Sequence, residues 1–189
     1  PGKLEAAASL QSPFTAALLR RKLAYDTTPA KVEIIELPMN AKFEIGPFAL
    51  EFVTLNHSMP EPNAIVLRTP LGTVFHTGDW KFDPDPVLGP VVDFDQLRSI
   101  GDENVLALVG DSTNVFVPGT SGSEASLLQN LTDLIAGCKN RVAVTCFASN
   151  VARLKTIYHA ATANGRAVCL VGSSLWRMDS AARETGYLT

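Results

Sequence analysis

The chain has 189 residues, of which 46% are hydrophobic, and a formal net charge of −3 at pH 7. This length can bury the core of one domain or of two incomplete ones. The apolar residues come in short blocks, none near the roughly 20 residues that a membrane-spanning helix needs, so we expect no membrane contact. A slightly acidic chain does not indicate nucleic-acid binding, although a local basic channel stays compatible with it.

The cysteines indicate the cellular location, and the first residues indicate where the given sequence starts. The three cysteines, Cys138, Cys146 and Cys169, have no C-x-x-C spacing, and two of them lie in apolar runs. We expect buried, reduced thiols and therefore a cytoplasmic protein. Residues 1–5 lack the basic and apolar pattern of a secretory leader and do not begin with Met, which indicates a start inside a longer gene product.

The first half of the chain is expected to form one helix and then strands. Ser12 before Pro13 is typical of an N-cap followed by proline at the first helical position, and the apolar spacing predicts a helix over residues 13–25. The turn at residues 69–72 predicts a hairpin. The predicted strands are 32–37, 48–55, 64–68, 73–77 and 105–109, with a long irregular connection over 79–101 that contains a short helix at 94–99.

The second half alternates between helices and strands. Helices are expected at residues 123–136, 150–164 and 174–184, and strands at 141–146 and 167–171. Such alternation is typical of a parallel sheet covered by helices in three layers. The change of pattern near residues 111–122 predicts a domain boundary.

His57 and Asp79 are the strongest candidates for chemistry in the sheet-rich half. Each follows a predicted strand, and the two strands are expected to be neighbours. An imidazole and a carboxylate at rigid strand ends suit a divalent metal, and a carboxylate can bridge two ions. By themselves, however, a single His and a single Asp at strand ends are more often hydrogen-bonded turn residues.

Several short motifs in order resemble the ribonuclease J family. They are N-H-S-M-P-E at residues 56–61, F-H-T-G-D-W-K-F-D at 75–83, D-S-T-N at 111–114 and F-A-S-N-V-A-R at 147–153, with S-P-F-T-A-A-L at 12–18 and G-Y-L at 186–188 in addition. The resemblance spans nearly the whole chain, and several independent motifs in register make coincidence improbable.

The resemblance implies an α/β fold, namely part of a metallo-β-lactamase αββα sandwich followed by the start of a β-CASP three-layer α/β domain. We expect residues 1–120 to form the partial metallo-β-lactamase domain and residues 121–189 the partial β-CASP domain. The implied function is a metal-dependent ribonuclease, acting as a 5′-to-3′ exonuclease, an endonuclease or both in RNA processing and decay. The implied partners are RNA and further copies of the same protein.

The resemblance also assigns metal ligands. It implies that His57 binds a metal and that Asp79 bridges two divalent ions, for which zinc is expected and manganese is compatible. The family's other ligands come from an H-x-H-x-D-H motif and a distant histidine, and the only histidines of this sequence are His57, His76 and His159. We therefore expect this chain by itself not to retain the ions and to be inactive.

The remaining histidines are not expected to bind metal. His76 lies on a strand two residues before Gly78, where a structural hydrogen bond is the favoured role. His159 lies in the middle of a predicted helix, where exposure or packing is the default.

Asp111 follows the predicted strand 105–109 in a polar cluster that, by itself, is typical of a turn or a helix cap. The resemblance matches Asp111 to the first acidic motif of β-CASP nucleases. It thereby implies a supporting catalytic role, in which Asp111 orients a neighbouring ligand or proton.

Candidate RNA-binding residues lie where a strand meets a helix. Ser149 and Asn150 either cap the helix or hold phosphate oxygens, and Arg153 pairs either with a phosphate or with a surface acid. Lys81 is a further candidate for phosphate neutralisation, and Trp80 either stacks on a base or packs beneath its loop. For Ser149, Asn150 and Arg153, the resemblance favours the RNA-facing role.

Two alternatives to a ribonuclease stay open. A non-catalytic RNA-binding or assembly module of the same fold agrees with the missing ligands. A metallo-β-lactamase-type hydrolase of small molecules is less consistent with the alternating block after residue 122, which such an enzyme does not need.

Overall fold

A computed structural model describes residues 8–25 and 32–189. Residues 1–5, on which the expectation of an internal start rests, lie outside the described part. The strands are β1 (Ala8–Gln11), β2 (Glu33–Glu36), β3 (Lys42–Ile45), β4 (Phe48–Thr54), β5 (Asn63–Thr69), β6 (Gly72–His76) and β7 (Val105–Val109). The helices are α1 (Pro13–Tyr25), α2 (Phe94–Gly101), α3 (Leu127–Ala136), α4 (Val151–Ala163) and α5 (Ser173–Glu184).

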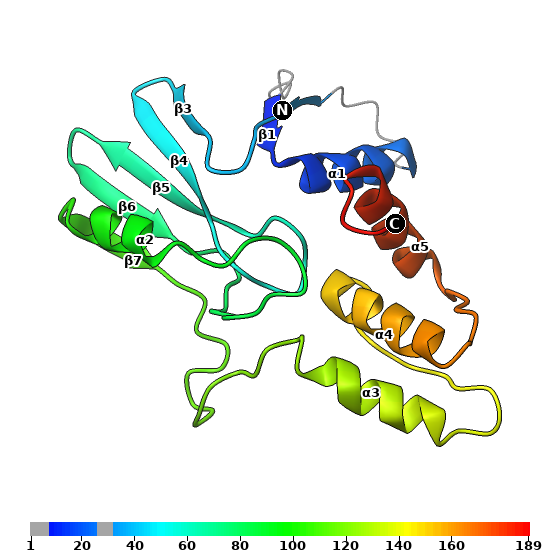
Figure 1. Ribbon diagram of the computed structural model, residues 1–189. Helices are drawn as coiled ribbons and strands as arrows, with labels where there is room; N and C mark the ends of the chain where they lie inside the picture. The colour runs from blue at the N-terminus through cyan, green and yellow to red at the C-terminus, as the bar shows by residue number, and fades with distance from the viewer. Residues whose placement is uncertain (1–7, 26–31) are drawn as a thin grey trace.

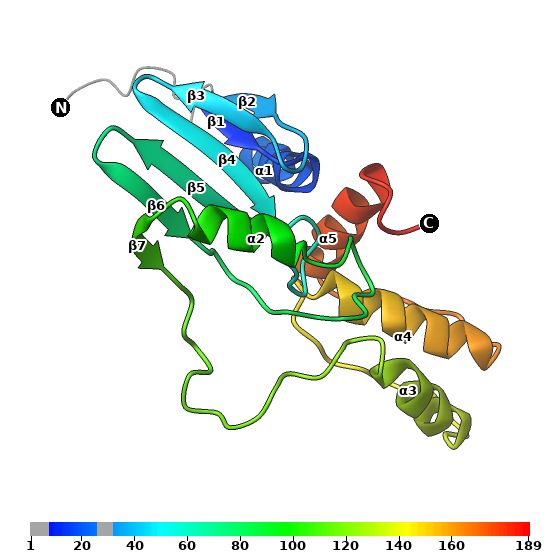
Figure 2. The ribbon, with the colours of Figure 1, turned by 60° about the vertical axis from the view of Figure 1, so that its left-hand side comes forward.

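A five-stranded sheet with the order β3-β4-β5-β6-β7 forms one side of the molecule (Figure 1). Strands β3 to β6 are antiparallel to their neighbours, whereas β7 runs parallel to β6. The predicted hairpin is confirmed, since Thr69 pairs with Gly72 at the turn between β5 and β6. Helix α2 lies against the sheet in Figure 2. The core of this part consists of Val53, Leu55, Ala64, Val66, Val92 and Ile100.

Helix α1 lies between two short strands in the chain. As the Ser12-Pro13 pair predicts, it begins at Pro13, with the Ala16 amide donating to the Ser12 carbonyl. Strands β1 and β2 on either side of it pair with each other in parallel, away from the five-stranded sheet. The predicted strand 32–37 therefore forms, but outside the main sheet.

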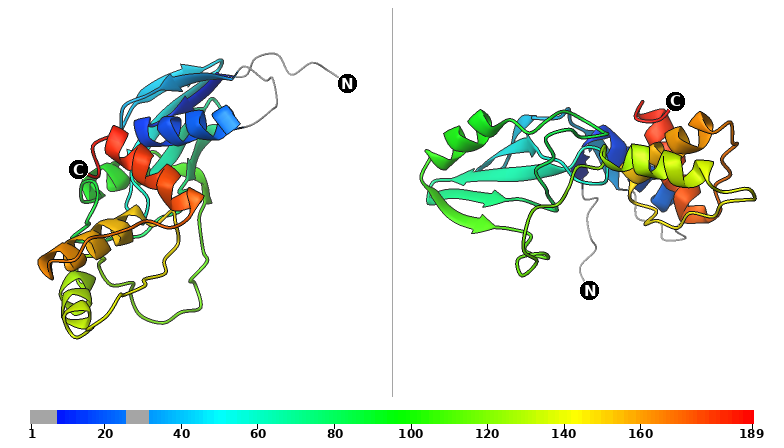
Figure 3. Two further views of the ribbon diagram at one scale, coloured as in Figure 1. Left: turned by 90° about the vertical axis from the view of Figure 1, so that its right-hand side faces the viewer. Right: turned by 60° about the horizontal axis from the view of Figure 1, so that its bottom comes forward.

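The helices α1, α3, α4 and α5 gather at the other side of the molecule (Figure 3). A buried cluster joins α1, α4 and α5, and four of its members are alanines that let helices approach closely. Its members are Phe14, Ala17, Leu88, Val151, Ala152, Ala181 and Ala182. Residues before and after position 120 thus share one core, and the division into domains 1–120 and 121–189 stays a prediction.

Two predicted strands differ from the structure. Residues 141–146 and 167–171 follow α3 and α4 but, within the described ranges, pair with no neighbouring strand. Apolar composition predicts an extended segment, but a strand also needs a partner for its backbone N–H and C=O groups. With residues of α3, α4 and α5, the two segments line a cleft of about 660 Å³.

The same segments carry two of the cysteines. All three cysteines are free thiols in the structure, yet Cys138 and Cys146 are only partly buried and Cys169 is exposed. The expectation of buried thiols was therefore wrong, because the segments of Cys146 and Cys169 have no sheet around them. No helix in residues 8–25 and 32–189 is long and apolar enough to cross a membrane.

Candidate active site

His57 lies in the loop between β4 and β5. The Leu55 amide donates to the Pro62 carbonyl at 2.9 Å and closes this loop at its base. The Lys81 amide donates to the Asn56 carbonyl at 2.8 Å, which joins the loop to the segment after β6. The expectation that the strands before His57 and Asp79 are neighbours was wrong, because β5 lies between β4 and β6. The bridge between Asn56 and Lys81 nevertheless brings the segment of His57 beside the segment after β6.

Asp79 follows β6 through a tight turn at Gly78. Gly78 has φ +59°, and a Cβ there would lie 3.2 Å from the Asn63 carbonyl oxygen, so glycine is needed for the turn. The Gly78 amide donates to Nδ1 of His76 at 3.0 Å, which is the structural role expected for His76. His159 is exposed on α4.

The structure brings His57 and Asp79 together at one cleft of about 310 Å³. Its lining includes Leu10, Gln11, Ser12, Thr15, Phe52, Met59, Pro60, Glu61, Pro62, Asn63 and Ile65 beside the two candidates. An imidazole and a carboxylate are suitable donors for zinc or manganese. Among the residues that the structure describes, however, no three His, Cys, Asp or Glu side chains form a group that could hold a metal ion. The pair fits a metal site only as part of a larger ligand set.

Asp111 follows β7 and lies near His57. Its carboxylate accepts hydrogen bonds from the Thr113 hydroxyl and from the Thr113 amide at 3.0 Å, and these bonds lower the pKa of Asp111. The positive form of His57 is near enough to lower that pKa further. The turn geometry that the polar cluster suggests is therefore present, and it holds the carboxylate in its ionised form near His57.

Trp80 packs beneath its loop. Its indole Nε1 donates to the Asp111 carbonyl at 3.2 Å, and its ring lies 4.9 Å from that of Phe82. This packing joins the segments after β6 and β7.

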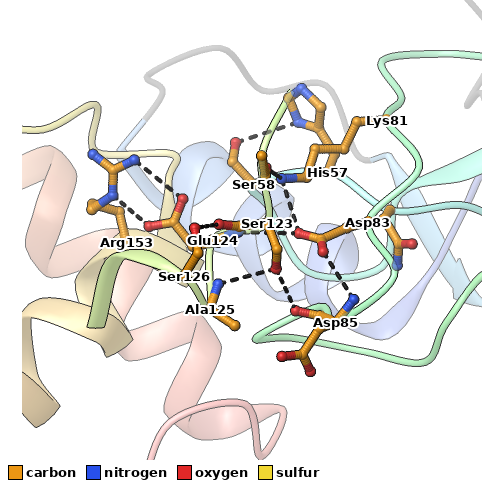
Figure 4. Close-up of polar contacts among 12 residues, drawn as sticks. His57, Ser58, Lys81, Asp83, Asp85, Ser123, Glu124, Ala125, Ser126 and Arg153 are labelled. Carbon is orange, nitrogen blue, oxygen red and sulfur yellow. Dashed lines mark hydrogen bonds and ion pairs between the residues drawn. The ribbon is translucent and has the colours of Figure 1, made fainter. Parts of the chain in front are cut away.

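A second, smaller cleft of about 150 Å³ adjoins the first at His57. Its lining includes Lys81 and Asn150 together with Asn56, Ser58, Asp83, Pro86, Val87, Leu88, Glu124 and Ala152. The Lys81 ammonium lies 3.0 Å from the Asp83 carboxylate and donates to the Gly122 carbonyl at 3.3 Å (Figure 4). Lys81 is thus near His57 but already paired with an acid.

Arg153 is also paired. Its guanidinium makes a two-pronged contact with the Glu124 carboxylate, which raises the pKa of Arg153 (Figure 4). Asn150 caps α4, since its side-chain oxygen accepts from the Arg153 amide at 2.8 Å. Ser149 is exposed and lines neither of the two clefts. Of the four candidates for RNA binding, the structure brings only Lys81 and Asn150 beside His57.

Three acids organise this region, and none of them was among the predicted site residues. Asp83 is buried, and burial tends to raise its pKa. The Ser123 hydroxyl, the Lys81 ammonium and the amides of Asp85 and Glu124 outweigh this and lower the pKa to about 2. Glu124 pairs with Arg153, and Glu61 is buried beside the first cleft. Glu61 and Asp83 both lie in motifs that carry the family resemblance, which was the signal that could have found them.

Comparison with known proteins supports the resemblance. The family model described as "Ribonuclease J, beta-CASP domain" matches residues 139–189, which contain α4 and α5. A solved structure of a protein of unknown function from Enterococcus faecalis superimposes with a TM-score of 0.57 over 82% of this chain and 42% of that one. At 18% identity, this likeness shows the fold alone.

Curated relatives match almost the whole sequence. Proteins named Ribonuclease J are 46% identical over 177 residues in Sinorhizobium meliloti, 36% over 177 in Thermus thermophilus and 42% over 178 in Mycobacterium tuberculosis. These matches cover 94%, 93% and 94% of this chain, and the chain spans 31% of the length of each relative. The motifs and the mixed α/β architecture agree with these matches, and the chain is similar over almost its whole length to about a third of the length of proteins named Ribonuclease J.

Proposed function

We propose that the full protein containing this sequence hydrolyses RNA phosphodiester bonds with divalent metal ions, as a 5′-to-3′ exonuclease, an endonuclease or both. The observation that carries the proposal is the meeting of His57 and Asp79 at one cleft. The names of the relatives, which are ribonucleases, support the choice of RNA as substrate.

Three residues of this chain have a definite role in the proposed site. His57 offers an imidazole nitrogen and Asp79 a carboxylate to the ions, and Asp111, which lies near His57, supports it from outside the ligand set. When bound, the ions would stabilise negative charge on the scissile phosphate and activate a water molecule. Zinc is the proposed metal, since a nitrogen and oxygen donor set suits it, and metal analysis would distinguish it from manganese.

The RNA side of the site is proposed to lie along the second cleft. Lys81 and Asn150 line it beside His57, and Ser149 and Arg153 lie at the same end of α4. For Arg153 to bind a phosphate, its contact with Glu124 has to open. We further propose that the full protein is cytoplasmic and homo-oligomeric, as the free thiols and the family resemblance suggest.

This chain alone is proposed to be inactive. Two ligands hold a divalent ion poorly against water and buffer, and the described residues supply no third one in the same group. Such a chain could instead serve as an RNA-binding module without catalysis, and that is the second candidate function.

The test uses the full gene product that contains this sequence. Asp79→Ala and His57→Ala should each lower kcat/KM on 5′-monophosphorylated RNA by at least about 100-fold and lower the bound metal measured by mass spectrometry. His159→Ala is the matched control, because His159 is exposed on α4, and it should change neither quantity. Full activity in Asp79→Ala would refute the metal assignment, and an inactive, metal-free wild type that still binds RNA would favour the second candidate.

A further inference from the structure

The loop that carries His57 is held by the N-termini of two helices. The amide of Ala152, in the first turn of α4, donates to the Ser58 carbonyl at 3.2 Å. The amide of Phe14, in the first turn of α1, donates to Oε2 of Glu61 at 2.8 Å. The first amides of a helix lack hydrogen-bond partners within the helix. The helix dipole is positive at this end, so a carbonyl or carboxylate oxygen binds favourably there. Both halves of the loop are thus fastened to the helical part of the molecule.

Glu61 is the point at which three distant segments meet. Its other carboxylate oxygen, Oε1, accepts from the Tyr187 hydroxyl at 3.2 Å. Phe14, which precedes Glu61 by 47 positions, and Tyr187, which follows it by 126 positions, therefore both bind this side chain. Burial raises the pKa of Tyr187 to about 12, and the negative charge of Glu61 adds to this, so the phenol remains a donor at neutral pH. Phe14 and Tyr187 also pack edge to face, with ring centroids 6.3 Å apart.

The backbone of Glu61 shows how firmly this residue is held. Its φ is +57°, a left-handed conformation that costs a residue other than glycine about 1 kcal/mol or more. Only 9% of Glu61 is exposed, although it carries a carboxylate. A strained backbone and a buried carboxylate persist only where neighbouring groups stabilise them. Here the Phe14 amide and the Tyr187 hydroxyl do so by donating hydrogen bonds to Glu61.

We infer that Glu61 is a positioning residue for the proposed metal site: its carboxylate fixes the loop of residues 55–62 so that His57 faces the cleft it shares with Asp79. Glu61 lines the same cleft, but its two oxygens are bound to Phe14 and Tyr187. It therefore acts through the loop and not as a ligand. The effect on metal binding rests on the proposed function, whereas the effect of Glu61 on the ordering of the loop does not depend on it.

The experiment compares variants of the full gene product by hydrogen exchange and by metal affinity. Glu61→Ala should speed amide exchange in residues 55–62 at least about tenfold over other segments and weaken metal binding in a chelator competition by about 10- to 100-fold. Glu61→Gln keeps an oxygen for the Phe14 amide and should stay within about threefold of wild type for both measurements. Glu44→Ala, which removes an exposed carboxylate from β3, is the control and should leave both unchanged.

The outcomes separate a positioning role from a merely structural one. If Glu61→Ala lowers the thermal midpoint while the loop exchanges as in wild type and the folded protein binds metal as before, the inference is wrong. If that variant does not fold, Tyr187→Phe takes its place, because it removes one of the two hydrogen bonds to Glu61. It should speed exchange in residues 55–62 and weaken metal binding in the same way but to a smaller extent. Wild-type values for both measurements in Tyr187→Phe would also overturn the inference. If instead the wild type and Asp79→Ala bind metal equally, the proposed function fails, and the exchange data still decide the role of Glu61.

Discussion

At the scale of the residue, the end of β6 shows how a single backbone conformation places a functional group. Gly78 has φ +59° directly before Asp79, and the space where a Cβ would lie is bounded by the Asn63 carbonyl. The H-T-G-D motif therefore combines a candidate ligand with the glycine that lets the chain turn toward His57.

Gly78→Ala should lower the free energy of unfolding of this chain by about 2 kcal/mol, from left-handed strain together with the 3.2 Å approach to Asn63. Gly46→Ala is the control, since Gly46 has φ +58° and nothing within 4 Å of an added Cβ, and it should cost about 1 kcal/mol. Urea unfolding measures both values. Equal losses in the two variants would show that the close approach to the Asn63 carbonyl does not lower the free energy of unfolding.

Asp83 makes stability depend on pH. Its pKa is about 2 in the folded chain against an ordinary value of 3.8, and each unit of difference is worth about 1.4 kcal/mol, so the ionised carboxylate contributes about 2 kcal/mol at neutral pH. Because the folded pKa is the lower one, this contribution is present above pH 3.8 and is lost as the pH falls toward 2.

Asp83→Asn removes this titration. The variant should be less stable than wild type by about 2 kcal/mol at pH 6, and the gap should narrow between pH 4 and pH 2. Chemical unfolding at a series of pH values checks this. A gap that stays constant over the whole range would show that the ion pair with Lys81 and the amide hydrogen bonds do not hold Asp83 in its charged form.

At the scale of the element, the N-terminus of α4 combines a cap with a proposed RNA contact. The Asn150 side chain accepts from the Arg153 amide, and Asn150 also lines the second cleft beside His57. Capping requires an acceptor oxygen on this side chain, whereas binding to RNA phosphates also requires that the side chain carry no negative charge.

Asn150→Ala should destabilise the chain by about 1 kcal/mol through loss of the cap, whereas Asn150→Asp keeps an acceptor and should stay within about 0.5 kcal/mol of wild type. In the full protein, Asn150→Asp should nevertheless weaken RNA binding at least about fivefold at low salt, because it adds negative charge beside the phosphates. Thermal unfolding and fluorescence anisotropy with labelled RNA measure the two effects. RNA binding that is unchanged in Asn150→Asp would leave capping as the role of Asn150.

At the scale of the whole molecule, much apolar surface stays uncovered in the described part of the chain. Strand β7 is at the edge of the sheet and exposes Leu106 and Leu108, and the extended segments 141–147 and 166–171 expose Phe147 and Val171. A free strand edge with apolar side chains favours association between copies.

The 189-residue chain should therefore associate with increasing concentration in sedimentation velocity experiments. Leu108→Lys, which places a charge on the edge strand, should shift the distribution toward the monomer. Leu71→Lys is the control, because Leu71 is 89% exposed at the tip of the hairpin between β5 and β6 and is not part of β7, and it should have little effect. Equal effects of the two changes would mean that β7 is not the contact.

The sequence by itself determined the elements whose signals are local. Ser12-Pro13 set the start of α1, the alternating pattern of the second half predicted α4 and α5, and the turn before Gly72 set the hairpin that leads to Asp79. These features depend on neighbours within a few residues, which the sequence displays directly. The motifs also sufficed to indicate the family whose members match almost the whole chain.

Only the tertiary structure decided which distant groups meet. It left residues 141–146 and 167–171 without strand partners, paired Arg153 with Glu124, and joined Glu61 to Phe14 and Tyr187. Strand pairing, burial and ion pairs depend on contacts between residues far apart in the chain, and no local spacing encodes which of several acids an arginine will meet. His57 and Asp79 could be named as candidates from the sequence motifs, although β5 separates the strands β4 and β6 that lead to them. The groups that Glu61, Asp83 and Glu124 bind became visible only in the fold.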